Sequence, residues 1–387
     1  MPRARRGRGE GSIYQREYGT WCATYSAGYA ASGKRIRKTI FGLTKDEVAK
    51  KLSKVQASRM DGTFVEPSRM RLATLLERWV EDAARPTIRE TTYVSYKGII
   101  TNHIDPRIVG TTLAILNPVH IQRLYADMER DGVGPRVRQL THAVLRRALK
   151  QALRWGLIAR NPCDAIDPPR VPKRQITPLT AEQVQTFLDA AKGDRLYAVY
   201  VVAIGTGMRL GEIFGLQWPD IDLQGLAINV RSTLIEIKGK LYLAEPKTPK
   251  SRRRIDLPKF VVDALTRHRA QSVREGFAKV PWVFCNSIGG PLRRTHFHVN
   301  HFKPLLDAAE LPAIRFHDLR HTSATLLLAA GVHPKVVQER LGHSQIGITL
   351  DTYSHVVPTL QLEAAGKLDA VMQMSAKPKK VRSSLTR

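Results

Sequence analysis

Five prolines lie within the 18 residues from Asn161 to Pro178, and this segment constrains the fold more than any other feature of the sequence. Proline fixes the backbone φ angle and has no amide hydrogen, so neither a helix nor a central strand continues through such a segment. A second break, GTFVEPSR, spans residues 62–69. The two breaks predict a multidomain protein, and 387 residues are enough to give each part its own core.

The first part, residues 1–66, is predicted to be a small β-sheet followed by one helix. Its β-prone runs cover residues 12–17, 21–27 and 34–41. The helix is expected to reach about Arg59. With 14 Lys and Arg against six Asp and Glu, this part is basic enough to indicate a DNA-contacting module.

Residues 70–166 are predicted to be all-α. The run at 72–83 reads as one helix, and Asn117-Pro118 marks the start of another. The longest helix, residues 135–155, repeats apolar residues at helical spacing and should turn that face to a core. Its basic residues fall largely on other faces: Arg138, Arg146, Arg147, Lys150 and Arg154. On so basic a chain, we expect them to follow the phosphates of a nucleic acid.

Residues 175–368 are predicted to form a mixed, mainly α-helical domain with a small antiparallel β-sheet. The β segment runs from Leu226 to Leu257 and turns at Gly239. Residues 369–387 are a basic tail.

Two predicted helix starts carry the same pair of signals. The capping boxes are Thr44 with Glu47 and Thr180 with Gln183. The apolar pairs placed to form a hydrophobic staple beside them are Leu43 with Val48 and Leu179 with Val184.

The charge balance points to a polyanionic partner. The chain has 62 Lys and Arg against 34 Asp and Glu, a formal net charge of +28. On a chain of ordinary globular composition, such an excess indicates nucleic acid. A ribosomal or membrane-surface protein is the alternative, and the chain length disfavours it.

No apolar run approaches the roughly 18–20 residues that a bilayer span needs. The basic start MPRARRGRGEG has no apolar segment behind it, which argues against a secretory signal. Cys22, Cys163 and Cys285 are scattered without metal-ligand spacing, as suits a reducing compartment. We therefore expect a bacterial cytoplasmic protein, associated with the nucleoid and not with a membrane.

Two fragments of the last domain place cations where an anion would bind. In GTGMRLGEIFGLQW, Arg209 stands at a helix start, which is unfavourable unless an anion lies there too. The alternative is a surface ion pair of Arg209 with Glu212, which contributes little. The loop AEPKTPKSRRRIDLP offers Lys247 and Lys250.

Two further fragments add histidines and a tyrosine. In RFHDLRHTSATLLLAAG, His317 and Arg320 share one helix face at i, i+3. In LGHSQIGITLDTYSHV, His343 follows a helix-ending glycine and Tyr353 comes ten residues later. Taken singly, a tyrosine is usually core and a histidine usually a hydrogen-bonded structural residue.

Together, two Arg, one Lys, two His and one Tyr suit the attack of a phenol on a phosphodiester. A phenol with a pKa of about 10 needs cationic surroundings or a base. Arginine forks fit the non-bridging oxygens, and Lys or His can protonate the departing ribose oxygen. Asp220 and Asp222 have no carboxylate partners for a two-metal site, so chemistry without a metal or other cofactor is favoured.

In this order, TGMRLGEIFGLQW, PKTPKSRR, HDLRHTSATLLLAAG and LGHSQIGITLDTYSH resemble the signature boxes of the tyrosine recombinases, the phage integrase family. The resemblance implies the DNA breaking–rejoining fold and an enzyme that needs neither metal nor ATP. It implies that Tyr353 is the nucleophile and that Arg209 and Arg320 clamp the scissile phosphate.

The remaining roles follow from the same resemblance. Lys247 would be the acid for the 5′-oxygen, with Lys250 as its competitor. His317 would accept or donate a proton, and His343 would hydrogen-bond the phosphate. Glu212 would orient neighbouring groups.

The flanking parts also resemble this family. Residues 70–166 look like its SAM-like core-binding domain, and residues 1–66 look like the arm-binding domain of phage and conjugative-element integrases. The implied function is integration or excision of a mobile element through a Holliday junction. The implied partners are double-stranded DNA with core and arm-type sites, three further copies of the chain in a homotetramer, a host DNA-bending protein and an excision factor.

Three other functions compete with this interpretation. A helix-turn-helix regulator without catalysis would explain TSATLLLAAGVHPKVVQERLG, with its turn at Gly331, but leaves Arg209, Lys247 and Tyr353 without roles. A metal-dependent transposase or nuclease is disfavoured by the lack of a carboxylate trio. A type IB topoisomerase would share the phosphotyrosine chemistry and need no specific site.

Overall fold

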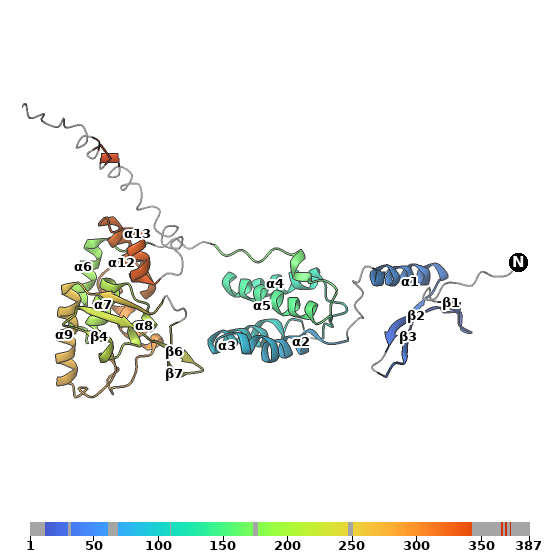
Figure 1. Cartoon of the computed structure of the whole chain (residues 1–387), viewed down its shortest axis with the longest axis horizontal. Helices are drawn as coiled ribbons and strands as arrows, with labels where there is room; N and C mark the ends of the chain where they lie inside the picture. The colour runs from blue at the N-terminus through green and yellow to red at the C-terminus, as the bar shows by residue number, and fades with distance from the viewer. Residues whose placement is uncertain are drawn as a thin grey trace, which may run out of the picture. The chain divides into compact units, whose positions relative to one another are not determined.

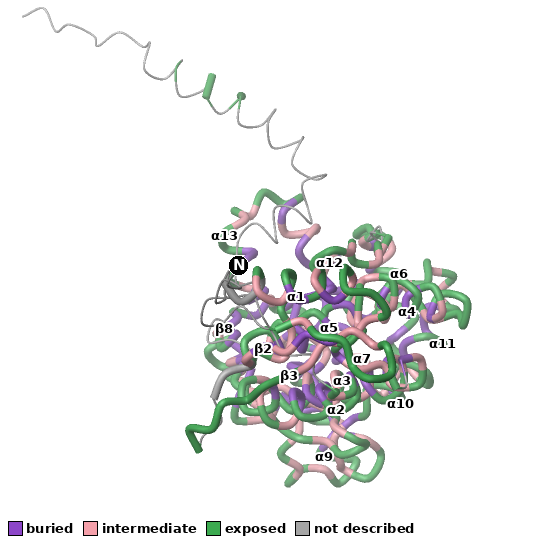
Figure 2. The backbone as a smooth tube through the Cα atoms, turned by 90° about the vertical axis from the view of Figure 1, so that its right-hand side faces the viewer, coloured by how far each residue is buried: buried purple, intermediate pink, exposed green. Residues whose placement is uncertain are grey.

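The computed structural model describes residues 12–29, 32–60, 69–108, 110–172, 177–246 and 251–342, with 365, 366, 368, 369 and 372. The chain divides into two compact units, residues 1–173 and 174–387 (Figure 1). The division falls inside the proline-rich segment. Figure 2 colours the buried residues of both units purple.

The start of the first unit is an antiparallel sheet with one helix on it. The elements are β1 (Ser12–Gln15), β2 (Trp21–Tyr29), β3 (Arg35–Gly42) and α1 (Lys45–Met60). The strands pair in the order β1-β2-β3. Ala23 and Tyr25 of β2 share a small core with Val48 and Leu52 of α1, because alternate residues of the strand face the helix. The predicted sheet and helix are confirmed.

The rest of the first unit is helical, as predicted. Its helices are α2 (Leu72–Arg78), α3 (Glu90–Ile99), α4 (Pro118–Arg130) and α5 (Pro135–Arg154). α2 continues into a π-helical turn, Trp79–Ala84, and α3 into another, Ile100–Ile104. The Asn117 side chain caps α4 by accepting from the His120 amide at 3.2 Å.

The second unit is built around α7 (Tyr197–Thr206), whose apolar residues are buried on nearly every side. The other helices are α6 (Ala181–Ala190), α8 (Leu210–Phe214), α9 (Lys259–Arg274), α10 (Arg294–Phe297), α11 (Lys303–Ala308), α12 (Phe316–Ala329) and α13 (Pro334–Leu341). Both α12 and α9 pack against α7. One core joins α6, α7, α9 and the first turn of α12.

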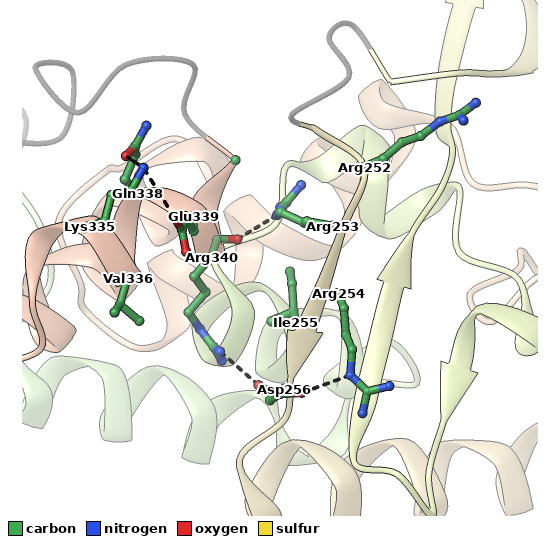
Figure 3. Close-up of a pocket in the computed structure, with 11 residues that line it drawn as sticks. Arg252, Arg253, Arg254, Ile255, Asp256, Lys335, Val336, Gln338, Glu339 and Arg340 are labelled. Carbon is green, nitrogen blue, oxygen red and sulfur yellow. Dashed lines mark hydrogen bonds and ion pairs between the residues drawn. The ribbon is translucent and has the colours of Figure 1, made fainter.

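The predicted small antiparallel sheet is also confirmed. Its strands are β4 (Ile221–Asp222), β5 (Ala227–Val230), β6 (Thr233–Ile237), β7 (Lys240–Ala244) and β8 (Arg253–Asp256). One sheet has the order β4-β5-β8, and β6 and β7 form a hairpin. Lys238 and Gly239 take positive φ angles at the hairpin turn, where the sequence predicted a turn. β8 is an edge strand, and α13 lies beside it (Figure 3).

Among the residues that the structure describes, no helix has the length and apolar character to span a bilayer.

Candidate active site

A left-handed glycine sets Arg209 at the start of α8. α7 ends at Thr206, and Gly207 follows with φ +65°, a region that other residues rarely adopt. A Cβ atom on Gly207 would lie 2.4 Å from Leu341 Cδ2, so the position also lacks room for a side chain. Two residues later, Arg209 is the N-cap of α8, as the sequence predicted.

Glu212 holds Arg209 in place from the first turn of α8. Its carboxylate accepts from the Arg209 amide at 3.1 Å and from Arg209 Nη1 at 2.8 Å. The pair is not the surface ion pair of the alternative interpretation, because the Glu212 side chain is only 4% exposed. Burial acts to raise the pKa of Glu212, but the charges of Arg253 and Arg209 hold it below its usual value. Glu212 is therefore a buried, ionised carboxylate.

Arg320 reaches the same turn from α12. It is 2% exposed, and its Nη1 donates to the carbonyl oxygen of Gly207 at 2.7 Å. Buried charges of this kind are costly unless their hydrogen bonds are satisfied. The contact fixes one guanidinium of α12 against the turn that leads into Arg209.

The first turn of α12 is fixed by Asp318. Its carboxylate accepts from the Arg315 amide at 2.8 Å and from Arg315 Nη2 at 2.7 Å. An acidic group in the first turn also suits the helix dipole. Asp318 therefore sets where α12 begins, and with it the directions of His317 and Arg320. Sequence reasoning did not single it out, although its spacing from Arg315 is that of a capping box.

His317 is an exposed residue of the first turn of α12, and its ring lies among positive charges. Burial by its surroundings and the nearby His321, Arg320 and Arg209 lower the pKa of His317 to about 4. The rings of His317 and His321 meet edge to face, 5.1 Å apart. His317 is therefore neutral near pH 7 and can accept a proton or a hydrogen bond.

Arg209 also contacts the end of α13. Its Nη2 lies 3.5 Å from the carbonyl oxygen of Gly342, the left-handed residue that ends α13. The structure thus brings together Arg209, Glu212, His317 and Arg320 from two helices, with the end of a third. The other predicted site residues, Lys247, His343 and Tyr353, lie outside the described residues, as does Lys250.

Sequence reasoning missed Arg253 on β8. Its Nη2 lies 3.0 Å from Glu212 Oε2, and its side chain is 7% exposed. The residue sits in a run of three arginines, and its two neighbours are exposed. Alternation along a strand places the middle residue of such a run on the opposite face, and that signal could have found it.

The two carboxylates that the sequence considered for a metal site are used for local structure. Asp220 accepts from the Gln217 amide at 3.1 Å, and Asp222 accepts from the Gly225 amide at 2.7 Å. In the part of the chain that is described, no three His, Cys, Asp or Glu side chains cluster as metal ligands would. What the site does offer is two fixed guanidinium groups beside a neutral imidazole, which suits a bound phosphate.

Comparison with known proteins identifies the family. Residues 177–359 match the model of the phage integrase family, and residues 71–128 match that of the phage integrase N-terminal SAM-like domain. A tyrosine recombinase XerC-like protein of Caldanaerobacter subterraneus subsp. tengcongensis is 30% identical over 371 residues, 89% of this chain and 95% of the relative. The ICEBs1 integrase of Bacillus subtilis is 25% identical over 371 residues, 93% of this chain and all of the relative.

A solved structure agrees in fold. The Tn1549 transposon integrase, in complex with transposon right-end DNA, superposes with a TM-score of 0.64 at 25% identity. The match covers 73% of this chain and 95% of that one. Sequence and fold thus agree that the chain belongs to the tyrosine recombinase family of integrases, enzymes that cut and rejoin DNA strands.

Proposed function

We propose that this chain is a site-specific integrase that cuts and rejoins DNA through a covalent bond to Tyr353. The observation that carries the proposal is the hydrogen bond of 2.7 Å from Arg320 Nη1 to the carbonyl oxygen of Gly207, two residues before Arg209. It holds both guanidinium groups at one turn, and His317 stands on the same helix as Arg320. Two guanidinium groups around one position suit the extra negative charge of a phosphodiester under attack. The relatives named above are recombinases and integrases, which supports this reaction class.

In the proposed reaction, the Tyr353 oxygen attacks the scissile phosphorus and forms a 3′-phosphotyrosine. The bond from phosphorus to the 5′-oxygen breaks, Lys247 protonates that oxygen, and His317 takes the phenol proton. Arg209 and Arg320 bind the non-bridging oxygens, with a hydrogen bond from His343. A 5′-hydroxyl of a partner duplex then attacks the phosphotyrosine, so the phosphodiester is restored without ATP or a metal.

The exchange of strands in two rounds passes through a Holliday junction and takes four copies of the chain on two duplexes. We assign residues 175–368 to catalysis, with 369–387 as a basic tail. The substrate is a mobile element with core and arm-type sites, and the place of action is the nucleoid in the bacterial cytoplasm. A host DNA-bending protein and an excision factor would set the direction.

Residues 70–166 are proposed to grip the core site through α5. Arg147, Lys150 and Arg154 line a hollow of about 450 Å³ together with Trp79 and Thr87. Within the described residues, Lys150 and Arg154 form no ion pair. Cations without a carboxylate partner keep their charge for phosphates.

Residues 1–66 are proposed to bind arm-type DNA through the sheet face that lies opposite α1. The pairing register places Tyr14, Cys22 and Phe41 in one row across that face, with Arg37 further along β3. Arg16 lies over the Phe41 ring at 5.1 Å. A small sheet with exposed arginine and aromatic groups fits a DNA groove.

The decisive experiment changes only the proposed nucleophile. Wild-type protein and Tyr353→Phe are incubated with a nicked duplex carrying the core site, mapped from the ends of the integrated element. Wild type should form a covalent protein–DNA adduct, and the variant should bind equally well and form none. An adduct that persists in the variant would refute the assignment.

The same preparation separates the competing functions. α12 and α13 do meet at a turn with Gly331 at φ +78°, as a helix-turn-helix would, but a regulator forms no adduct. A type IB topoisomerase relaxes plasmids that carry no site, whereas an integrase recombines two sites. A metal-dependent nuclease loses its activity when a chelator removes the metal.

A further inference from the structure

The Glu212 carboxylate is shared by two arginines. Arg209 Nη1 lies 2.8 Å from Oε1, and Arg253 Nη2 lies 3.0 Å from Oε2. With Arg209 alone, the buried carboxylate would cancel the charge that Arg209 must offer to a phosphate. Arg253 supplies a second positive charge, so the three side chains together keep a net charge of +1.

Arg253 also binds the end of α13. Its Nε donates to the carbonyl oxygen of Arg340 at 2.6 Å, and Figure 3 shows this side chain reaching from β8 to α13. Nη1 donates to the carbonyl oxygen of Ser251 at 3.0 Å, which ties the guanidinium to the backbone two residues before Arg253. Every arm of the guanidinium thus has a partner.

Gly342 makes room for this arrangement. It ends α13 with φ +69°, and a Cβ atom there would lie 3.1 Å from Arg253 Nη1. Arg209 Nη2 touches the carbonyl oxygen of the same glycine. Arg209 and Arg253 therefore share two neighbours. One is the Glu212 carboxylate, and the other is the end of α13, which directly precedes His343 in the sequence.

The neighbours of Arg253 are engaged differently. Arg252 pairs with Glu245 and Arg254 with Asp256, and both arginine side chains are more than half exposed. In Figure 3, Arg252 points away from α13. Of these three consecutive arginines, only Arg253 is buried and in contact with Glu212, although all three are the same residue type.

We propose that Arg253 is a positioning residue for DNA cleavage. It neutralises the Glu212 carboxylate and fixes the end of α13. Arg209 is thereby oriented towards the scissile phosphate, and Glu212 does not cancel its positive charge. The proposal rests on the function proposed above. It assigns to Arg253 no contact with DNA. Its effect should appear in the rate of cleavage rather than in the affinity for DNA.

The test compares Arg253→Gln, Arg253→Lys and the exposed neighbour variant Arg254→Gln in the full-length chain. The measured quantities are the single-turnover rate of adduct formation on the nicked core-site duplex, the Kd for that duplex and the Tm. Arg253→Gln should lower the rate at least tenfold while the Kd stays within twofold. Arg253→Lys should recover part of the rate, since it keeps the charge but loses the fork geometry. Arg254→Gln should match wild type.

Glu212→Gln provides a second arm if Arg253→Gln folds poorly. In this variant Arg209 loses the charged partner that orients it, so the rate of adduct formation should fall with little change in Kd. An Arg253→Gln rate within twofold of wild type would overturn the proposal. So would losses of rate, affinity and Tm that go together in both Arg253 variants, because they would report only a damaged fold. Failure of the proposed function is distinct, since wild type itself would then form no adduct.

Discussion

Arg320 donates through Nη1 to the carbonyl oxygen of Gly207, with 2.7 Å between the two atoms. Residues 113 positions apart in sequence are joined by this bond, and Arg209 follows Gly207 by two residues. The turn between α7 and α8 is thus a common support for both arginines. Anything that moves its backbone should displace both guanidinium groups.

Gly207→Ala tests this support. The left-handed φ costs an alanine roughly 1–2 kcal/mol, and the new Cβ would meet Leu341 Cδ2 at 2.4 Å. We expect a lower free energy of unfolding and an adduct rate reduced at least tenfold. Denaturant unfolding and the adduct assay measure the two effects.

Gly331→Ala is the matched control. Gly331 also has a left-handed φ, of +78°, but among the described residues beyond its chain neighbours no atom lies within 4 Å of its Cβ position. This variant should carry the backbone strain alone, roughly 1–2 kcal/mol, with adduct formation near the wild-type rate. Equal losses in both variants would contradict a special role for the turn.

The His317 imidazole should titrate near pH 4 in the free protein, well below its ordinary 6.5. Binding of a DNA phosphate beside it adds negative charge, which favours the protonated ring and raises the pKa. NMR titration of the ring protons, assigned by their loss in His317→Gln, measures both values. A midpoint near 6.5 without DNA would contradict the crowded, cationic surroundings.

The same lowered pKa predicts how stability depends on pH. Between about pH 4 and 6.5 the unfolded chain binds a proton at His317 that the folded chain does not. The contribution of His317 is therefore fully present above pH 6.5 and is lost as the pH falls towards 4. The free energy of unfolding should decline less over this window in His317→Gln than in wild type.

The basic face of α5 should divide into two classes. Arg138 pairs with Glu129 at 2.7 Å and Arg146 with Asp164 at 2.7 Å, so two of the five predicted phosphate-binding residues are already neutralised. The double variant Lys150→Gln and Arg154→Gln should weaken DNA binding and reduce the slope of log K against log salt by about 2. Arg146→Gln is the control and should change the slope much less. Binding titrations at several salt concentrations provide the measurement.

Local signals predicted much of the fold. The strands, the Asn117 cap and the position of Arg209 at a helix start depend on neighbours in sequence, and the structure has all three. The π-helical continuations of α2 and α3 escaped prediction, because a single widened turn leaves no periodicity of its own. Their positions depend on packing within the helical part.

In the candidate site, too, local sequence signals do not predict contacts that depend on tertiary packing. Spacing on one helix linked His317 to Arg320, but nothing local links Arg253 to Glu212, which lie 41 residues apart. Their pairing depends on the edge position of β8 beside α13. Catalytic residues are therefore easier to identify from the sequence than the residues that position them. Which residues position them depends on tertiary contacts.

The two helix starts with identical signals give the last prediction. Both threonines accept from the amide three residues on, at 3.2 Å, but the staples differ. Leu179 is 2% exposed and Val184 is buried, whereas Leu43 is 86% exposed, so the predicted staple of Leu43 with Val48 is wrong. The reason is that Val48 packs inward against the sheet, where Leu43 does not reach.

Leu179→Ala and Leu43→Ala should therefore differ although their sequence motifs match. Leu179→Ala empties a site in the core of the second unit and should lower its free energy of unfolding by about 2–4 kcal/mol. Leu43→Ala removes a solvent-exposed side chain and should change stability by less than about 0.5 kcal/mol. Denaturant unfolding of both variants measures the difference. Comparable losses of stability in the two variants would contradict the prediction, because they would mean that the Leu43 side chain is buried in solution.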